Sequence, residues 1–161
     1  MTDSSPDDSV IARLEDEERR IILPRFDLED AWTLGSSLAE RARAEKYPVL
    51  LDIRRGEHVL FRAVLPGSTP DHQFWAARKA ALVQRMEASS ALVTARMAAS
   101  GTDPFADGWL DHRYVLAGGS FPVRVAGVGV VGAVTASGMT SEEDHALVVS
   151  GLETLLTQLQ S

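Results

Sequence analysis

Residues 118–149 constrain the fold of this chain more than any other segment. Two stretches rich in β-branched residues, 121–125 and 128–135, are separated only by Ala126-Gly127, and a threonine-to-acid capping box begins at Thr140. A short connection that contains glycine is typical of a hairpin between antiparallel strands, and a capping box is typical of a helix start. The segment therefore predicts a β-hairpin followed directly by a helix.

The periodicities of the remaining segments extend this prediction to the whole chain. Apolar residues recur at helical spacing in several segments, which are separated by short β-branched runs and turn residues. The expected helices span residues 10–20, 28–46, 70–87, 89–100 and 140–159, and the expected strands span residues 21–26, 49–53, 58–65, 114–117, 121–125 and 128–135. Because no strand–helix–strand crossover repeats, this order predicts an α+β fold, with an antiparallel sheet of about five strands flanked by helices.

The hairpin between residues 49–53 and 58–65 has two alternative registers. A three-residue loop pairs Leu51 with Val59 and gathers apolar side chains on one face, whereas a two-residue loop sets a carboxylate beside Val59. We therefore expect the longer loop. It also places Asp52 opposite His58 on the other face.

Composition narrows the class of protein. A chain of 161 residues, 45% of them hydrophobic, can bury one core, so we expect a single domain over residues 9–161 after a disordered, acidic segment at 1–8. The formal charge of -7 disfavours nucleic acid as a partner. The longest apolar run, residues 125–136, is too short to span a membrane, and the basic and apolar regions of a signal peptide are missing, so we expect a cytoplasmic protein. Cysteine is absent, which excludes thiolate chemistry.

The glycine loop Gly118-Gly119-Ser120 is the first candidate ligand-binding site. Glycine lets a backbone approach a ligand closely, although tight turns in an antiparallel sheet explain the same residues.

The second candidate is His145, which helical periodicity places on the inner side of the last helix. There it can ligate haem iron, act as a base, or hydrogen-bond within the core.

The third candidate is the group Trp75, Arg78 and Lys79. Two cations about one turn beyond an indole ring can clamp a carboxylate or the propionates of a haem. The alternative is a core or interface tryptophan with cations that face solvent.

A fourth candidate is His112, within Asp111-His112-Arg113 after a loop rich in glycine and proline. The four histidines lack metal-ligand spacing and no catalytic motif accompanies them, so no bound metal ion is expected.

Several blocks together resemble a known group of proteins. They are, in chain order, Leu65-Pro66-Gly67-Ser68-Thr69-Pro70-Asp71, Trp75-Ala76-Ala77-Arg78-Lys79, Gly118-Gly119-Ser120-Phe121-Pro122-Val123-Arg124-Val125, Val130-Val131-Gly132-Ala133-Val134, Ser137-Gly138 and Glu143-Asp144-His145. With these blocks spread over most of its length, the chain resembles the uncharacterised UPF0303 group of the haem-degrading-domain superfamily, which is similar to the HbpS and GlcG proteins.

The resemblance implies a profilin-like sandwich of sheet and helices, assembly into homo-oligomers, and haem as a ligand or substrate of some members. Three functions remain open. The leading hypothesis is an oligomer that binds haem or a small anionic ligand near Trp75, Arg78, Lys79 and the glycine loop. The others are a haem-degrading enzyme, in which His145 or His112 supplies at most an iron ligand, and an oligomeric interaction scaffold without catalysis.

Overall fold

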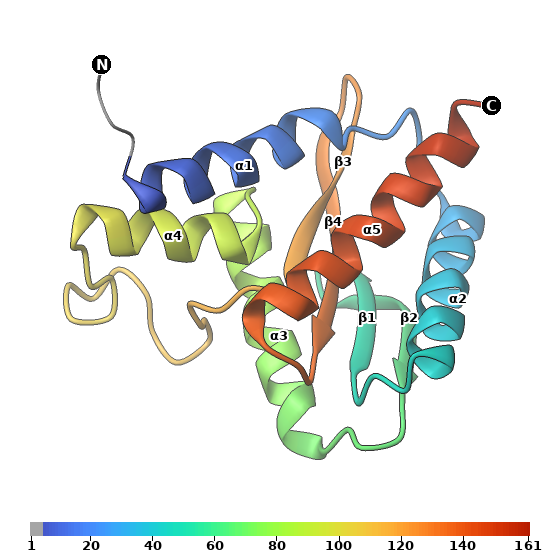
Figure 1. Cartoon of the computed structure of the whole chain (residues 1–161), viewed down its shortest axis with the longest axis horizontal. Coiled ribbons are helices and arrows are strands. Elements are labelled where there is room, and N and C mark those ends of the chain that lie inside the picture. Colours follow the sequence, from blue (N-terminus) through green and yellow to red (C-terminus); the bar gives the residue numbers. More distant parts are fainter. Residues whose placement is uncertain (1–4) are drawn as a thin grey trace.

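The computed structural model describes residues 5–161, in which five helices and four strands are arranged around one sheet (Figure 1). In chain order these are α1 Pro6–Arg20, α2 Leu28–Ala44, β1 Leu50–Arg55, β2 His58–Val64, α3 Pro70–Met86, α4 Ser90–Ser100, β3 Ser120–Val125, β4 Gly129–Ser137 and α5 Ser141–Leu159. The sheet is antiparallel throughout, in the order β2-β1-β4-β3. The predicted α+β class is confirmed, with four strands in place of about five.

Two of the expected strands do not join this sheet. Residues 114–117 have no strand pairing, and within residues 21–26 only Leu23 pairs, through a single parallel bridge to Val125. Ile21 and Leu23 are nevertheless buried in the main core. The apolar pattern that predicted a strand there therefore marks an extended segment that is anchored in the core.

The β1–β2 hairpin differs from the predicted one in its register. Leu51 pairs with Ala63 rather than with Val59, because the connection is two residues long and β2 contains a bulge at Leu60. The prediction of a three-residue loop was therefore wrong. It relied on apolar pairing along β2, but much of this strand is exposed, so burial does not select that register. The β3–β4 connection is one residue longer than predicted, at three residues.

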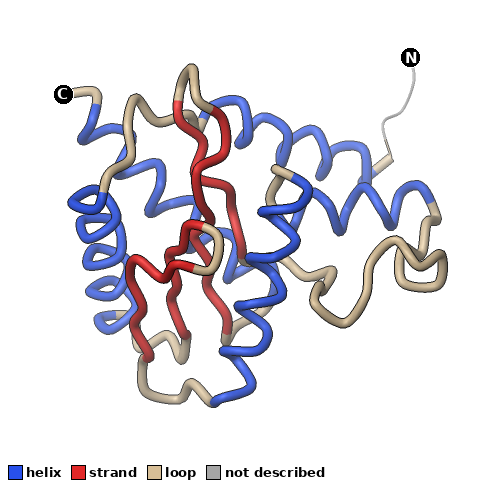
Figure 2. The backbone as a smooth tube through the Cα atoms, turned by 180° about the vertical axis from the view of Figure 1, so that it is seen from behind, coloured by secondary structure: helices blue, strands red, loops and turns tan. Residues whose placement is uncertain are grey.

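The two faces of the sheet differ in character. Helices α2 and α5 cover an apolar face, where Phe121, Val134 and Leu152 belong to the main core. Helix α3 crosses the other face, which is seen from behind in Figure 2. None of the helices in the described part of the chain is long and apolar enough to cross a membrane.

A buried charge cluster lies on the α3 side of the sheet. Asp52 is opposite Arg62 on one neighbouring strand and Thr135 on the other, and not opposite His58 as predicted. Its carboxylate is fully buried and accepts hydrogen bonds from Arg54 Nε at 2.6 Å and from Arg62 Nη2 at 2.8 Å. This pairing between opposite charges stabilises the observed register.

Helices α1 and α4 form a smaller core beside the sheet. Leu14 of α1 packs with Leu92 of α4 in this core, and Figure 1 shows the two helices running side by side. Helix α1 begins at Pro6, so three residues of the segment that was expected to be disordered are helical. The first part of that segment, residues 1–4, lies outside the described residues.

Gly35 allows α2 to pack closely on the sheet. A Cβ at this position would collide with the ring of Phe61, which also contacts Trp32 at a centroid distance of 5.7 Å. Overpacking costs about 1–3 kcal/mol, against a gain of about 1 kcal/mol in helix propensity. We therefore expect Gly35→Ala to lower the free energy of unfolding measured with urea. The loss should shrink in a Phe61→Ala background, and an equal loss there would contradict the collision.

Candidate functional site

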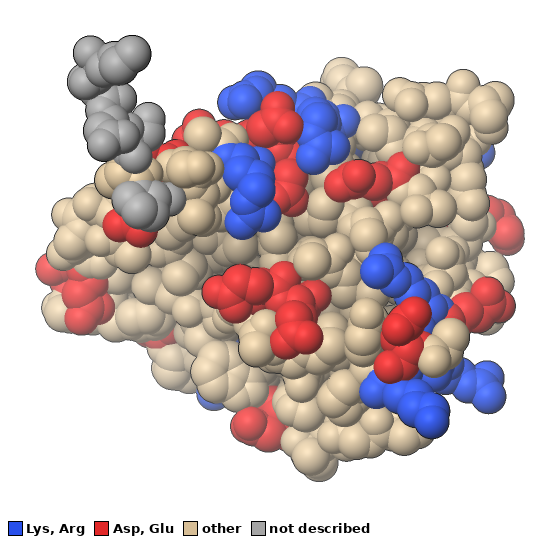
Figure 3. Space-filling view, in the orientation of Figure 1, with Lys and Arg blue, Asp and Glu red and all other residues tan. Residues whose placement is uncertain are grey.

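A groove of about 630 Å³ lies between α1, α4 and α5, and we call it the α1–α5 groove. Much of its wall is small or apolar, including Val10, Leu14, Ala95, Ala98 and Val149. Its charged residues are Arg13, Asp16, Glu17, Arg20, Glu142 and Glu153, and both arginines are ion-paired. Figure 3 shows basic and acidic side chains interspersed along α1, and acids over the N-terminal part of α5. The groove has the volume and the mixed lining of small-molecule sites.

His145 lines this groove from the start of α5 and is only 4% exposed. Its Nε2 atom lies 3.1 Å from Glu17 Oε2, and its buried Nδ1 atom has no hydrogen-bond partner among the described residues. A ring nitrogen held by a carboxylate, with the other nitrogen left over, is the arrangement found around metal-bound histidines. The predicted inward position of His145 is confirmed, while its role as a ligand stays a prediction.

The N-cap of α5 sets the position of His145 in the groove. Thr140 Oγ1 accepts from Glu143 N–H at 3.2 Å, as the capping box predicted, and this fixes where the helix begins. Gly118 lines the same groove beside Ser141, and a Cβ on Gly118 would come within 2.8 Å of the Ser141 carbonyl oxygen. The glycine loop therefore packs against the first turn of α5, close to His145.

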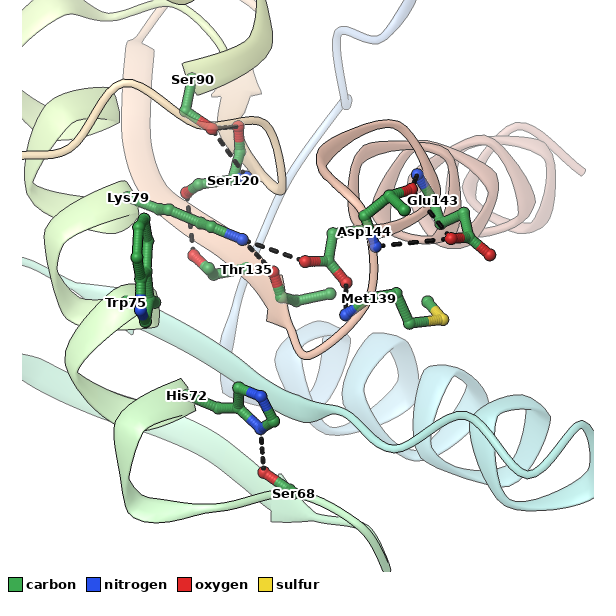
Figure 4. A network of polar contacts seen from close by, with 12 residues as sticks. Ser68, His72, Trp75, Lys79, Ser90, Ser120, Thr135, Met139, Glu143 and Asp144 are labelled. Carbon is green, nitrogen blue, oxygen red and sulfur yellow. Dashed lines mark hydrogen bonds and ion pairs between the residues drawn. The ribbon is translucent and has the colours of Figure 1, made fainter.

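A second cavity, of about 320 Å³, lies between α3 and the β4–α5 corner, and we call it the α3–α5 pocket. Lys79 and Asp144 form a buried ion pair at this pocket, with Nζ 3.0 Å from Oδ2 (Figure 4). Lys79 also donates to Ala136 O at 3.2 Å, and Asp144 Oδ1 accepts from Met139 N–H at 3.1 Å. Burial raises the pKa of Asp144, and the neighbouring ammonium of Lys79 opposes that shift.

Trp75 and Gly119 complete the surroundings of this ion pair. Trp75 lines the pocket and donates from Nε1 to Asp71 Oδ2 at 3.1 Å. Gly119 has a φ of 132°, and a Cβ there would lie 2.6 Å from Ala136 O and 2.7 Å from Lys79 Nζ. Only glycine fits between this backbone and the ammonium group. The structure thus brings together three residues that the sequence marked as candidates, Trp75, Lys79 and Gly119.

Arg78, His112 and Ser120 lie apart from both cavities. Arg78 Nε donates to His112 O at 3.1 Å on the exposed surface, so Arg78 and Lys79 do not form the predicted clamp of two cations. Ser120 is fully buried, with its Oγ 2.8 Å from Thr135 Oγ1 and its N–H donating to Ser90 Oγ at 3.0 Å. Its hydroxyl therefore contributes to packing beneath α3 and α4.

Asp111 does not orient the neighbouring histidine. Hydrogen bonds from Arg113 hold this carboxylate and lower the pKa of Asp111 to about 2. His112 is exposed. The Asp-His-Arg segment therefore forms a local ion pair at the surface.

Two acidic partners in these sites were not predicted from the sequence. Glu17 is one of many charged residues in α1, so its type alone does not distinguish it. It lies three residues after Leu14 and therefore on the same buried side of the helix. Asp144 is one of three consecutive acids in the first turn of α5, where any carboxylate suits the helix dipole. Only the fold distinguishes it, by placing Lys79 opposite.

A family model described as haem degrading protein HbpS-like matches residues 26–153. The chain belongs to the HbpS-like family. A UPF0303 protein of Streptomyces coelicolor is 50% identical over 151 residues, which cover 93% of this chain and 96% of the relative. A UPF0303 protein of Burkholderia thailandensis is 43% identical over 138 residues, 84% of this chain and 83% of the relative. The resemblance drawn from the sequence blocks is thereby confirmed.

Solved structures share the HbpS-like fold. The Ybr137w protein has a TM-score of 0.85 at 29% identity, covering 94% of this chain and 90% of that chain. A double mutant of HbpS from Streptomyces reticuli has a TM-score of 0.66 at 20% identity, with coverages of 81% and 87%. A PduOC:haem complex has a TM-score of 0.68 at 18% identity, with coverages of 80% and 93%. The last two are alike in fold alone.

Helix α1 precedes the segment that the family model matches. The contact between Glu17 and His145 therefore joins a residue outside that segment to one within it. One wall of the α1–α5 groove is built by this helix. The groove thus depends on more of the chain than the residues that the family model matches.

Proposed function

We propose that this HbpS-like protein binds haem, or a flat apolar ligand of similar size, in the α1–α5 groove. The observation that carries the proposal is His145, whose ring meets Glu17 at Nε2 and has no partner at Nδ1 among the described residues. The description of the family and the haem complex of a protein with the same fold support haem as the first ligand to test.

The residues of the groove fit such a ligand. Pockets of about 300–1,000 Å³ with largely apolar walls are typical sites for small molecules. Arg13 and Arg20 lie at the groove, and beyond their ion pairs with acids of α1 and α5 each guanidinium keeps further N–H donors for carboxylates. His145 would hold the iron, and Glu17 would keep its imidazole in one tautomer. Because the ring is only 4% exposed, contact with the iron requires α1 to shift relative to α5. Bound haem supplies an iron centre for oxygen chemistry or electron transfer.

Titration of the purified protein with haem tests this proposal. We expect a saturable Soret band at one haem per chain. Iron-free protoporphyrin should bind more weakly, because it makes the same apolar contacts but lacks a bond to His145. Absorbance that rises linearly without saturation, as for free haem, would contradict the proposal.

We also propose that the chain forms a homo-oligomer. Large apolar side chains are exposed on α2 and on β2, where Leu28 is 61%, Trp32 63% and Val64 63% exposed. Exposed apolar residues on an edge strand and its covering helix favour association with another copy. Light scattering at micromolar concentration should give a multiple of the chain mass, and a monomer mass would refute the assembly.

A further inference from the structure

The α3–α5 pocket offers hydrogen-bond donors that the described residues do not fill. Lys79 Nζ donates to Asp144 Oδ2 at 3.0 Å and to Ala136 O at 3.2 Å, and its third ammonium proton has no acceptor among them. His72 Nδ1 accepts from Thr69 N–H at 3.1 Å, so the neutral ring carries its proton on Nε2. Both Lys79 and His72 line the pocket.

The carboxylates nearest these donors already accept hydrogen bonds. The two oxygens of Asp144 accept from Lys79 and from Met139 N–H, and Asp71 Oδ2 accepts from Trp75 Nε1. Figure 4 shows Lys79 and Asp144 pointing toward one another, with the Trp75 ring beside the lysine chain. The spare donors of Lys79 and His72 favour a ligand that supplies acceptor oxygens.

Charge and volume narrow the ligand class further. Lys79 and Asp144 together carry no net charge, and Asp71 adds a negative charge among the lining residues, so a dianion is disfavoured against a single carboxylate. The volume of about 320 Å³ lies near the lower end of the range for small-molecule sites. Trp75 and Met139 supply apolar surface for a short carbon chain.

We propose that the α3–α5 pocket binds a short-chain monocarboxylate, of about two to five carbons given the size of the pocket. Its carboxylate would accept from Lys79 and His72, and its carbon chain would lie against Trp75. This site is separate from the α1–α5 groove and goes beyond the proposed haem binding. The bound carboxylate would also add a second anion beside the single ammonium of Lys79, which favours weak, reversible binding.

Titration of the haem-free protein with sodium propionate, followed by ¹H–¹⁵N NMR, tests this site independently of haem. We expect saturable shifts of the Trp75 indole and of the Met139 and Ser141 amides, which sodium chloride at equal ionic strength does not reproduce. Shifts that match those in sodium chloride would overturn the proposal.

A matched pair of variants on α3 distinguishes propionate binding in the pocket from binding to the surrounding surface. Trp75→Leu should weaken propionate binding by about tenfold, equivalent to about 1.4 kcal/mol. Phe74→Leu alters an exposed neighbour that does not line the pocket and should leave binding unchanged. Amide dispersion shows whether each variant is folded. Equal affinities of the two variants, or equal losses, would also overturn the proposal.

Discussion

Replacing Lys79 with methionine should lower the free energy of unfolding by about 3–5 kcal/mol, because Asp144 is left buried without its partner. A double variant, Lys79→Met with Asp144→Leu, removes both charges. It should recover most of the loss or exceed the wild type by about 1–4 kcal/mol, as replacements of buried ion pairs by apolar residues often do. Urea denaturation of the wild type, both single variants and the double variant gives the coupling energy, and additive losses would contradict this role of the ion pair.

The same ion pair should make the free energy of unfolding depend on pH in an unusual direction. Burial raises the pKa of Asp144 above its ordinary value of 3.8. A carboxyl group with a raised folded-state pKa contributes its full stabilisation below the unfolded-state pKa and loses it as the pH rises through the folded-state pKa. The free energy of unfolding of the wild type, relative to the double variant, should therefore increase from pH 7 toward pH 4. A decrease over this range would contradict the direction of the shift.

Replacing His145 should remove iron ligation from the haem complex. We expect His145→Gln to shift the Soret band and to weaken haem binding by at least about 10–100-fold, since even loss of a residue that only hydrogen-bonds to a metal ligand has effects of this size. Glutamine keeps a polar group near Glu17, which limits damage to the buried site. His112→Gln is the matched control, because it removes an exposed imidazole. Parent-like spectra and affinity in His145→Gln would refute the ligand assignment.

Local sequence signals predicted the elements that depend on neighbouring residues. Asp27 caps α2 by accepting from Asp30 N–H at 2.9 Å, and Thr140 caps α5 in the same way. Such hydrogen bonds span three residues, so a pattern in the sequence is enough to predict them. The antiparallel sheet followed from short connections that contain glycine, such as the one between β3 and β4.

Contacts between distant segments were not predictable in this way. His145 is 128 residues from Glu17 and Lys79 is 65 from Asp144, and nothing local marks either acid as a partner. The β1–β2 register likewise depended on the buried pair of Asp52 and a strand arginine, which the count of apolar pairs ignored.

The different directions of the Arg78 and Lys79 side chains were, by contrast, predictable from the sequence. Adjacent residues on a helix point about 100° apart, so a single pocket does not readily receive both cations. In the structure Lys79 is buried against Asp144 while Arg78 donates to a surface carbonyl. The paired-cation hypothesis overlooked this geometry.

Measuring the haem affinity of two variants, substituted at adjacent positions of α4, tests the proposed groove most directly. Ala98 lines the groove, whereas Ala99 does not, and both are exposed, so tryptophan is tolerated at either position. We expect Ala98→Trp to fill part of the groove and weaken haem binding at least about tenfold, a loss of about 1.4 kcal/mol, while Ala99→Trp binds haem as the wild type does. Equal haem affinity in the two variants would contradict binding in the α1–α5 groove.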